Sequence, residues 1–182
     1  MALDHGNERG MIQRVFGERR STMIDEARPY AVAELHATQA RTRDQMRGLL
    51  ETLPHAAFEP AVKEDEHGEA PWSAGQVIAH AVDAQINTFL RAARLAVGLG
   101  LGPDVPSHPD PALMPALSRA DSLALLDIGD RDLAELRISP PTDAVSEVTR
   151  EDEIMGTSGY KDMLLFLCLH DDDHLEQLKV LV

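Results

Sequence analysis

The sequence predicts an all-α protein, a four-helix bundle built as one domain. The chain has 182 residues, the size of an ordinary single domain. Only 4% of the residues are aromatic while 43% are hydrophobic, so Leu, Ala, Val, Ile and Met must fill the core. Such a core favours helices, because strand-rich domains rely on β-branched and aromatic side chains. Four segments also repeat apolar residues at intervals of three and four, the helical period.

The first predicted helix covers residues 29–53. Pro29 suits a first helical turn and Pro54 closes the segment. One face carries Val32, Leu35, Gln39, Thr42, Met46, Leu49 and Leu53. Gln39 and Thr42 are polar at places where a helix that only packs is usually apolar.

Residues 1–28 precede this helix and are only weakly amphipathic. Met11, Ile12, Val15 and Phe16 cluster there. A short extra helix, a dimer arm and a frayed end all fit this pattern. We therefore divide the chain into an N-terminal arm or short helix, 1–28, and a bundle domain, 29–182.

The second predicted helix covers residues 73–97. Ser73 followed by Gln76 matches a capping box. Two adjacent stripes follow, one with Val77, His80, Ala84, Thr88 and Arg91, the other with Ile78, Val82, Ile86 and Phe89. Glycines from Gly98 onward end the helix. The next segment, 98–117, contains five prolines and is too long for a tight hairpin, so we expect it to cross one end of the domain.

The third and fourth predicted helices cover residues 118–138 and 159–182. Ser118 with Asp121 resembles a cap of the third helix, and Ser158 with Asp162 one of the fourth. The third helix has its apolar stripe at Leu126, Gly129, Leu133 and Leu136. Between the two helices, residues 142–157 are polar and turn-like.

The charge of the chain limits its partners. Seventeen basic and 31 acidic residues give a formal net charge of −14. This charge repels phosphate backbones and anionic lipids, so we expect no nucleic acid and no membrane as partner. No apolar run is long enough to span a bilayer, and no secretory signal is recognisable. A single cysteine, Cys168, excludes an internal disulfide framework, and a cytoplasmic location is the simplest interpretation.

Two histidines lie on the inner stripe of the fourth helix. His170 and His174 are four residues apart, so their imidazoles can converge on one metal ion. The stripe also contains Met163, Phe166, Leu167, Leu178 and Leu181, which indicates that it faces inward. Buried imidazoles need partners, and a metal ion is one solution. A hydrogen-bonded core pair is the alternative.

His80, on the inner stripe of the second helix, is the third candidate ligand. A histidine from a neighbouring helix can complete a three-nitrogen site with one coordination position open, as in catalytic zinc sites. Asp83, Asp173 and Gln177 are candidates to orient a ligand ring. We expect Asp171, Asp172 and Asp173 to form a solvated acidic face, Cys168 to be a core residue, and the remaining histidines to lie at the surface or in loops: His5, His36, His55, His67 and His108.

Two segments together resemble the DinB/YfiT-like superfamily. They are PWSAGQVIAHAVD, around Trp72 and His80, and LLFLCLHDDDHLEQLKVL, around His170 and His174. The family pattern has a Trp-Ser/Thr helix start followed by a His, then a late helix with His-x3-His-x2-Gln. The resemblance covers about residues 29–182. It implies a four-helix bundle with a long crossover loop between the second and third helices. It also implies a divalent metal, often zinc or nickel, held by His80, His170 and His174, and homodimers are common in the family.

The resemblance leaves three hypotheses for function. The first is an enzyme that transfers a low-molecular-weight thiol to a small electrophilic substrate, as the better understood members of the family are thiol-dependent S-transferases or a mycothiol-dependent isomerase. The second is a metal-dependent hydrolase, for which Asp83 or Asp173 is the available base. The third is a non-enzymatic small-molecule-binding or stress-response module. No residue stands out from the sequence as a catalytic group.

Overall fold

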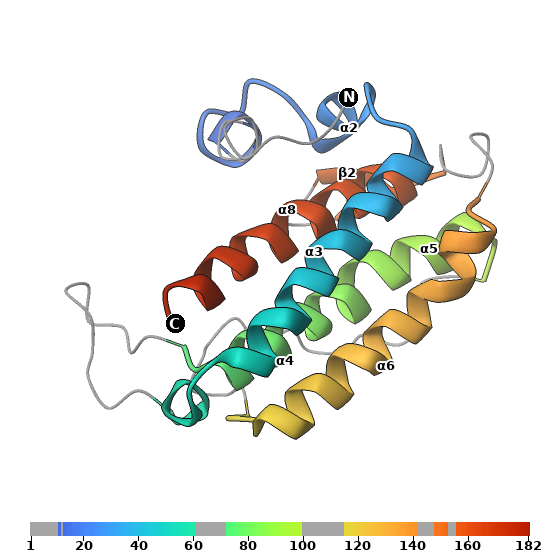
Figure 1. Ribbon diagram of the computed structural model, residues 1–182. Helices are drawn as coiled ribbons and strands as arrows, with labels where there is room; N and C mark the ends of the chain where they lie inside the picture. The colour runs from blue at the N-terminus through green and yellow to red at the C-terminus, as the bar shows by residue number, and fades with distance from the viewer. Residues whose placement is uncertain (1–10, 12, 61–71, 100–114, 142–147, 153–155) are drawn as a thin grey trace.

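Four helical rods make up the body of the protein (Figure 1). The computed structural model describes residues 11, 13–60, 72–99, 115–141, 148–152 and 156–182. The rods are α3 (Val32–Thr52), the continuous series α4 (Ala74–Ala84), η3 (Gln85–Phe89) and α5 (Leu90–Ala96), then α6 (Arg119–Ile138) and α8 (Tyr160–Lys179). These are the four predicted helices, so the predicted all-α bundle is confirmed.

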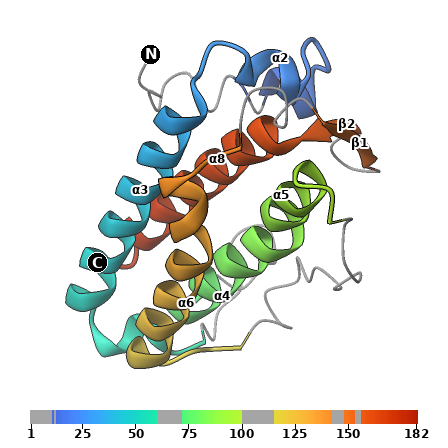
Figure 2. The ribbon, with the colours of Figure 1, turned by 90° about the vertical axis from the view of Figure 1, so that its right-hand side faces the viewer.

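The directions of the rods account for the long crossover. α3 and α8 run the same way and lie along each other, while α4–α5 and α6 run the opposite way (Figure 2). α5 therefore ends at one end of the bundle and α6 begins at the other. Most of the predicted crossover segment, 98–117, lies outside the described residues, but its two ends are placed as that prediction requires.

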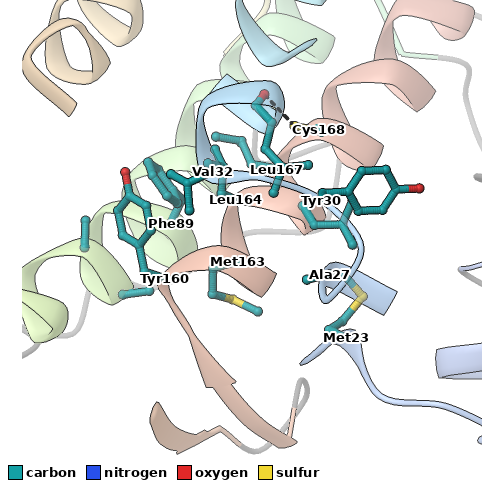
Figure 3. Close-up of a cluster of buried hydrophobic side chains, with 14 of the residues drawn as sticks. Met23, Ala27, Tyr30, Val32, Phe89, Tyr160, Met163, Leu164, Leu167 and Cys168 are labelled. Carbon is teal, nitrogen blue, oxygen red and sulfur yellow. Dashed lines mark hydrogen bonds between the residues drawn. The ribbon is translucent and has the colours of Figure 1, made fainter. Parts of the chain in front are cut away.

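The N-terminal segment contains a short helix, one of the three possibilities left open by the sequence. A π-helical turn, η1 (Gln13–Gly17), precedes α2 (Met23–Ala27), whose N-cap Thr22 accepts a hydrogen bond from the backbone of Asp25. Met23 and Ala27 join a buried apolar cluster with Tyr30 and Met163 (Figure 3). This contact fixes α2 against α8.

The two ends of the second rod form as the sequence predicts, but its middle does not. Ser73 caps α4 and forms the predicted capping box with Gln76. Gly98 has a φ of 78°, the left-handed region that glycine enters at little cost, and its N–H bonds to Leu95 just beyond the end of α5. Between them, η3 is a π-helical turn, in which each residue rotates less about the helix axis than in an α-helix. Ile86, predicted on the stripe with Ile78, Val82 and Phe89, lies in this turn and is 40% exposed.

The segment before α8 corrects two predictions. β1 (Thr149–Asp152) pairs antiparallel with β2 (Gly156–Gly159), where only polar turns were expected. The N-cap of α8 is Gly159, one residue later than the predicted Ser158, which is buried in β2. Both carboxylate oxygens of Asp162 accept the Gly159 N–H at 3.0 Å. Ser158 is not the cap because α8 begins at Tyr160, two residues after it.

Two apolar clusters fill the bundle, one towards each end. The first includes Leu35, Phe89, Leu133 and Leu169, and the second includes Met46, Ile78, Leu126 and Leu175. Along every rod, polar side chains lie between the members of the two clusters. We call this level the polar layer, and its residues are Gln39, Arg43, His80, Gln85, Asp130, His170, Asp171 and His174. The candidate site lies in this layer.

The short 3-10 helix η2 (His55–Phe58) follows α3 and closes the second cluster. Its Phe58 is buried there against residues of α4. Within the part of the chain that the structure describes, no helix is both long and apolar enough to cross a membrane.

Candidate metal centre

Three histidines from two rods meet in the polar layer. His80 comes from α4, and His170 and His174 lie one turn apart on α8. The Nε2 atom of His170 lies 3.2 Å from that of His80 and 3.2 Å from that of His174. One nitrogen of each ring lies within 4.8 Å of the other two. The structure thus brings the three predicted ligands to one point.

Hydrogen bonding among the rings cannot satisfy this arrangement. Each imidazole nitrogen has a single in-plane direction, used either by a proton or by a lone pair. The Nε2 atom of His170 faces two other nitrogens at once, and it can form a well-directed bond with one of them. A cation accepts all three lone pairs together. Zinc bonds of 2.0 to 2.1 Å at tetrahedral angles place ligand nitrogens about 3.3 Å apart, close to the two distances of 3.2 Å from the Nε2 atom of His170.

Gln177 fixes the protonation of one ring. Its Oε1 accepts a hydrogen bond from Nδ1 of His174 at 2.8 Å. Nδ1 therefore carries the proton, and the lone pair remains on Nε2, which faces the other two histidines. Gln177 takes the orienting role for which the sequence made it a candidate.

Burial keeps the three imidazoles neutral, the form that binds metals. Burial lowers the pKa of His80 to about 4, with a smaller contribution from His174. The pKa of His170 is lowered well below its ordinary range by burial and then by the charges of His174, His80 and Arg43. The pKa of His174 is also lowered by burial, although its bond to Gln177 opposes this. No proton has to leave these nitrogens at neutral pH before a cation binds.

Two aromatic side chains border the three histidines. The Trp72 indole meets the His80 ring edge to face at 4.8 Å between centroids and is nearly parallel to His174 at 6.1 Å. On the other side, Phe166 lies 5.6 Å from the His170 ring. His80, His170, Trp72 and Phe166 are all half-buried, so the centre is flanked by apolar surface and not sealed inside the core.

A comparison with protein families identifies the family that shares this fold. The DinB superfamily matches residues 40–178, which include all three histidines and most of the four rods. The chain belongs to the DinB superfamily. No curated protein and no solved structure shows significant similarity to it.

The two carboxylates considered as a base, Asp83 and Asp173, lie outside the cluster of ligand atoms. Oδ1 of Asp83 accepts a hydrogen bond from Asn87 at 2.8 Å, and Asp173 is exposed. Among the described residues, no carboxylate oxygen and no thiol joins the three histidine nitrogens. Neither Asp83 nor Asp173 therefore orients a ligand ring through a described hydrogen bond.

The prediction that Asp171 is solvated is wrong. Its side chain is fully buried and accepts two hydrogen bonds from Arg43, each at 2.6 Å. Arg43, which is also fully buried, was not among the residues singled out from the sequence. The available signal was Gln39, polar on an apolar stripe, because Arg43 follows it by one helical turn and bonds to the same carboxylate. The neighbouring Asp172 and Asp173 do not share this burial.

The prediction for His36 is also wrong. This side chain is 97% buried and lies 2.8 Å from the Tyr160 hydroxyl through its Nε2. The apolar stripe of α3 is wider than predicted and includes this position. Cys168 is a buried core residue, as predicted, and its thiol donates to the Leu35 carbonyl. His55 is exposed as expected, and the other histidines expected at the surface lie outside the described residues: His5, His67 and His108.

Proposed function

We propose that this DinB protein is a metal-dependent S-transferase, which joins a low-molecular-weight thiol to a small electrophile. The observation that carries the proposal is the meeting of three neutral histidine nitrogens without a carboxylate among the described residues. A divalent cation held by three protein ligands keeps a position for one further ligand. We propose zinc or nickel as the cation, and a homodimer as the assembly.

The residues of the chain divide the work among them. His80, His170 and His174 would hold the cation, and Gln177 keeps the His174 ring in the tautomer that binds it. The cation supplies charge that lowers the pKa of a bound thiol, so that thiolate is present at neutral pH. Trp72 and Phe166 give the site apolar borders, which suit an uncharged electrophile and exclude water.

Thiol transfer is favoured over hydrolysis because, among the described residues, no carboxylate oxygen joins the three histidine nitrogens. Hydrolysis requires a group that accepts a proton from water at the site. Asp171 is bound by Arg43, Asp173 is exposed, and Asp83 does not belong to the cluster of ligand atoms. A thiol has a far lower pKa than water, so its deprotonation depends less on such a group.

The test combines metal analysis with a transfer assay. Protein purified without a histidine tag is analysed for metals, loaded with Zn²⁺ or Ni²⁺, and mixed with glutathione, mycothiol or bacillithiol and an alkylating or epoxide electrophile. We expect the loaded protein to accelerate loss of free thiol. His170→Ala should reduce this rate by at least about 100-fold, since it removes a ligand of the cation.

His55→Ala provides the matched control, because His55 is exposed on η2 and outside the cluster. Its rate should equal that of the wild type. If His170→Ala matches the wild type for every thiol and electrophile, the transferase proposal is wrong. Ester or amide hydrolysis that depends on His170 would favour the hydrolase instead, and metal-free protein with unchanged stability would favour a non-enzymatic module.

A further inference from the structure

One arginine contacts both helices that carry the candidate ligands, in each case at the residue that follows a ligand in the sequence. Arg43 of α3 donates through Nη2 and Nε to the two oxygens of Asp171, each at 2.6 Å. The same Nη2 lies 3.3 Å from the carbonyl oxygen of Ala81. Asp171 follows His170 in α8, and Ala81 follows His80 in α4. A single planar guanidinium therefore contacts both ligand helices, through the carboxylate of Asp171 on α8 and the backbone carbonyl of Ala81 on α4.

Stability alone is a poor explanation for this buried pair. Both side chains have no exposed area. Removing two charges from water costs several kcal/mol per ion, and apolar replacements of similar size are often neutral or stabilising. The pair lies between two apolar clusters that could have continued through this level. The geometry that this ion pair fixes between the helices explains its presence better.

Further hydrogen bonds extend the pair to the fourth rod. Gln39 of α3 donates to Oδ2 of Asp171 at 3.0 Å and accepts from Arg137 of α6 at 2.6 Å. Arg137 also contacts Asp130 on α6 at 3.0 Å. Hydrogen bonds thus join all four rods at this level, and Arg43 makes the direct contacts with both α4 and α8.

We infer that Arg43 and Asp171 are positioning residues, which set the distance and rotation between α4 and α8 so that His80 meets His170 and His174. The guanidinium is planar and binds a carboxylate in a fixed, two-pronged geometry, whereas apolar contacts allow sliding and rotation. The inference rests on the proposed three-histidine metal site and assigns no direct contact with substrate or cation to Arg43.

The test measures metal binding and coordination geometry rather than activity. The double variant Arg43→Met with Asp171→Leu removes both charges together and leaves neither one buried alone. We expect it to remain folded, with a Zn²⁺ affinity lowered on the order of 10-fold or more in competition with a chromophoric chelator. Its Co²⁺-loaded form should show a visible absorption spectrum different from that of the wild type, because the ligand angles change.

Two further variants complete the test. Arg47→Met is the matched control. Arg47 lies one turn farther along α3, and its described ion pairs are with Asp127 and Asp130 of α6. It should keep the wild-type Zn²⁺ affinity and Co²⁺ spectrum. Arg43→Lys keeps the charge but not the two-pronged geometry, so its affinity should fall below that of the wild type even if the double variant does not fold.

The outcomes separate this inference from the proposed function. Wild-type affinity and an unchanged Co²⁺ spectrum in the double variant, or wild-type affinity in Arg43→Lys, would overturn the positioning role and leave the metal site intact. Failure of the wild-type protein itself to bind Zn²⁺ would overturn the metal site, and the inference with it.

Discussion

His36 and Tyr160 form a buried polar pair between the first turns of α3 and α8. Their contact is 2.8 Å long, and Phe89 packs against both rings (Figure 3 shows Tyr160 and Phe89). Burial lowers the pKa of His36 to about 4, with a smaller contribution from Arg137, and burial raises the pKa of Tyr160. The pair is therefore neutral at pH 7, and protonation of His36 is unfavourable in the folded state.

Acidification should destabilise the protein through His36. Its pKa is about 4 when folded and 6.5 ordinarily, so its stabilising contribution is complete above pH 6.5 and is lost as the pH falls towards 4. His36→Gln keeps a polar partner for Tyr160 and does not titrate. We expect the fall in free energy of unfolding between pH 6.5 and 4 to be smaller in this variant, by up to about 3 kcal/mol.

Urea unfolding at both pH values, with a chelator present, measures this difference. Asp162 acts in the opposite sense, because burial raises its pKa to about 6, but it contributes equally to both proteins and cancels. His55→Gln, at an exposed position, should keep the wild-type pH dependence. Identical pH dependence in His36→Gln and the wild type would contradict the assignment.

At this scale, the sequence predicted residues whose neighbours in the chain define their environment. His170, His174 and Gln177 lie on one helix, so their spacing alone brings them together. Asp171 was misjudged because its partner, Arg43, is 128 positions away and belongs to another rod. A run of acidic residues is usually solvated, and only the three-dimensional packing distinguishes the one that is not.

At the scale of elements, Gly75 allows a close approach between two segments of the backbone. A Cβ atom added there would lie 2.9 Å from the carbonyl carbon of Leu117, and nearer still to its oxygen and nitrogen. Leu117 immediately precedes Ser118, the N-cap of α6. The absent side chain thus lets the start of α4 rest on the start of α6.

Gly75→Ala should separate these two helix starts. Since the methyl group meets backbone atoms that cannot rotate away, we expect the free energy of unfolding to fall by about 1 to 3 kcal/mol, as measured by urea denaturation. Gly48→Ala is the matched control: this glycine lies within α3 with nothing near the added Cβ, and the change should stabilise the protein by about 1 kcal/mol. Equal effects of the two substitutions would refute the close-packing argument.

The elements themselves were largely predictable, because helix caps are local signals. Ser73 with Gln76 and Ser118 with Asp121 lie where capping residues were expected. The hairpin of β1 and β2 was missed, since TRED and GTSG lack the alternating apolar residues that mark strands. The π-helical turn η3 was missed as well, because residues 85–89 carry no pattern that distinguishes a π turn from an ordinary α-helical turn.

For the whole molecule, the important feature is that the candidate ligands come from two rods. A cation bound by His80 and by the two α8 histidines would link α4 to α8 only in the folded state. Free Zn²⁺ at 100 times its Kd should then raise the free energy of unfolding by about 2.7 kcal/mol and the Tm by several degrees.

Calorimetry of chelator-treated protein, with and without added Zn²⁺, provides the measurement. His170→Ala should lose most of the increase in Tm, whereas His55→Ala should retain it, because His55 is outside the cluster. An equal increase in all three proteins would indicate that Zn²⁺ binds elsewhere on this acidic chain.

The general architecture followed from the sequence, but the polar layer did not. Periodicity and breakers define four rods and a long crossover, and family resemblance assigns three histidines to one site. The layer joins residues of different rods, such as Gln39 and Arg43 with Asp171, that no local pattern connects. Its existence depends on the relative register of the rods, which the sequence of each rod alone does not determine.

The wide turn η3 has a consequence for how the second rod tolerates change. Deleting one residue between 85 and 89 would restore ordinary α-helical winding and leave the downstream faces nearly unchanged, because a π turn holds one residue more than an α-helical turn of the same rotation. The alanines that α5 buries, Ala92, Ala93 and Ala96, would then stay buried, and His80 upstream would keep its orientation. The second rod can therefore lose one residue at η3 while both α4 and α5 keep the faces that they bury.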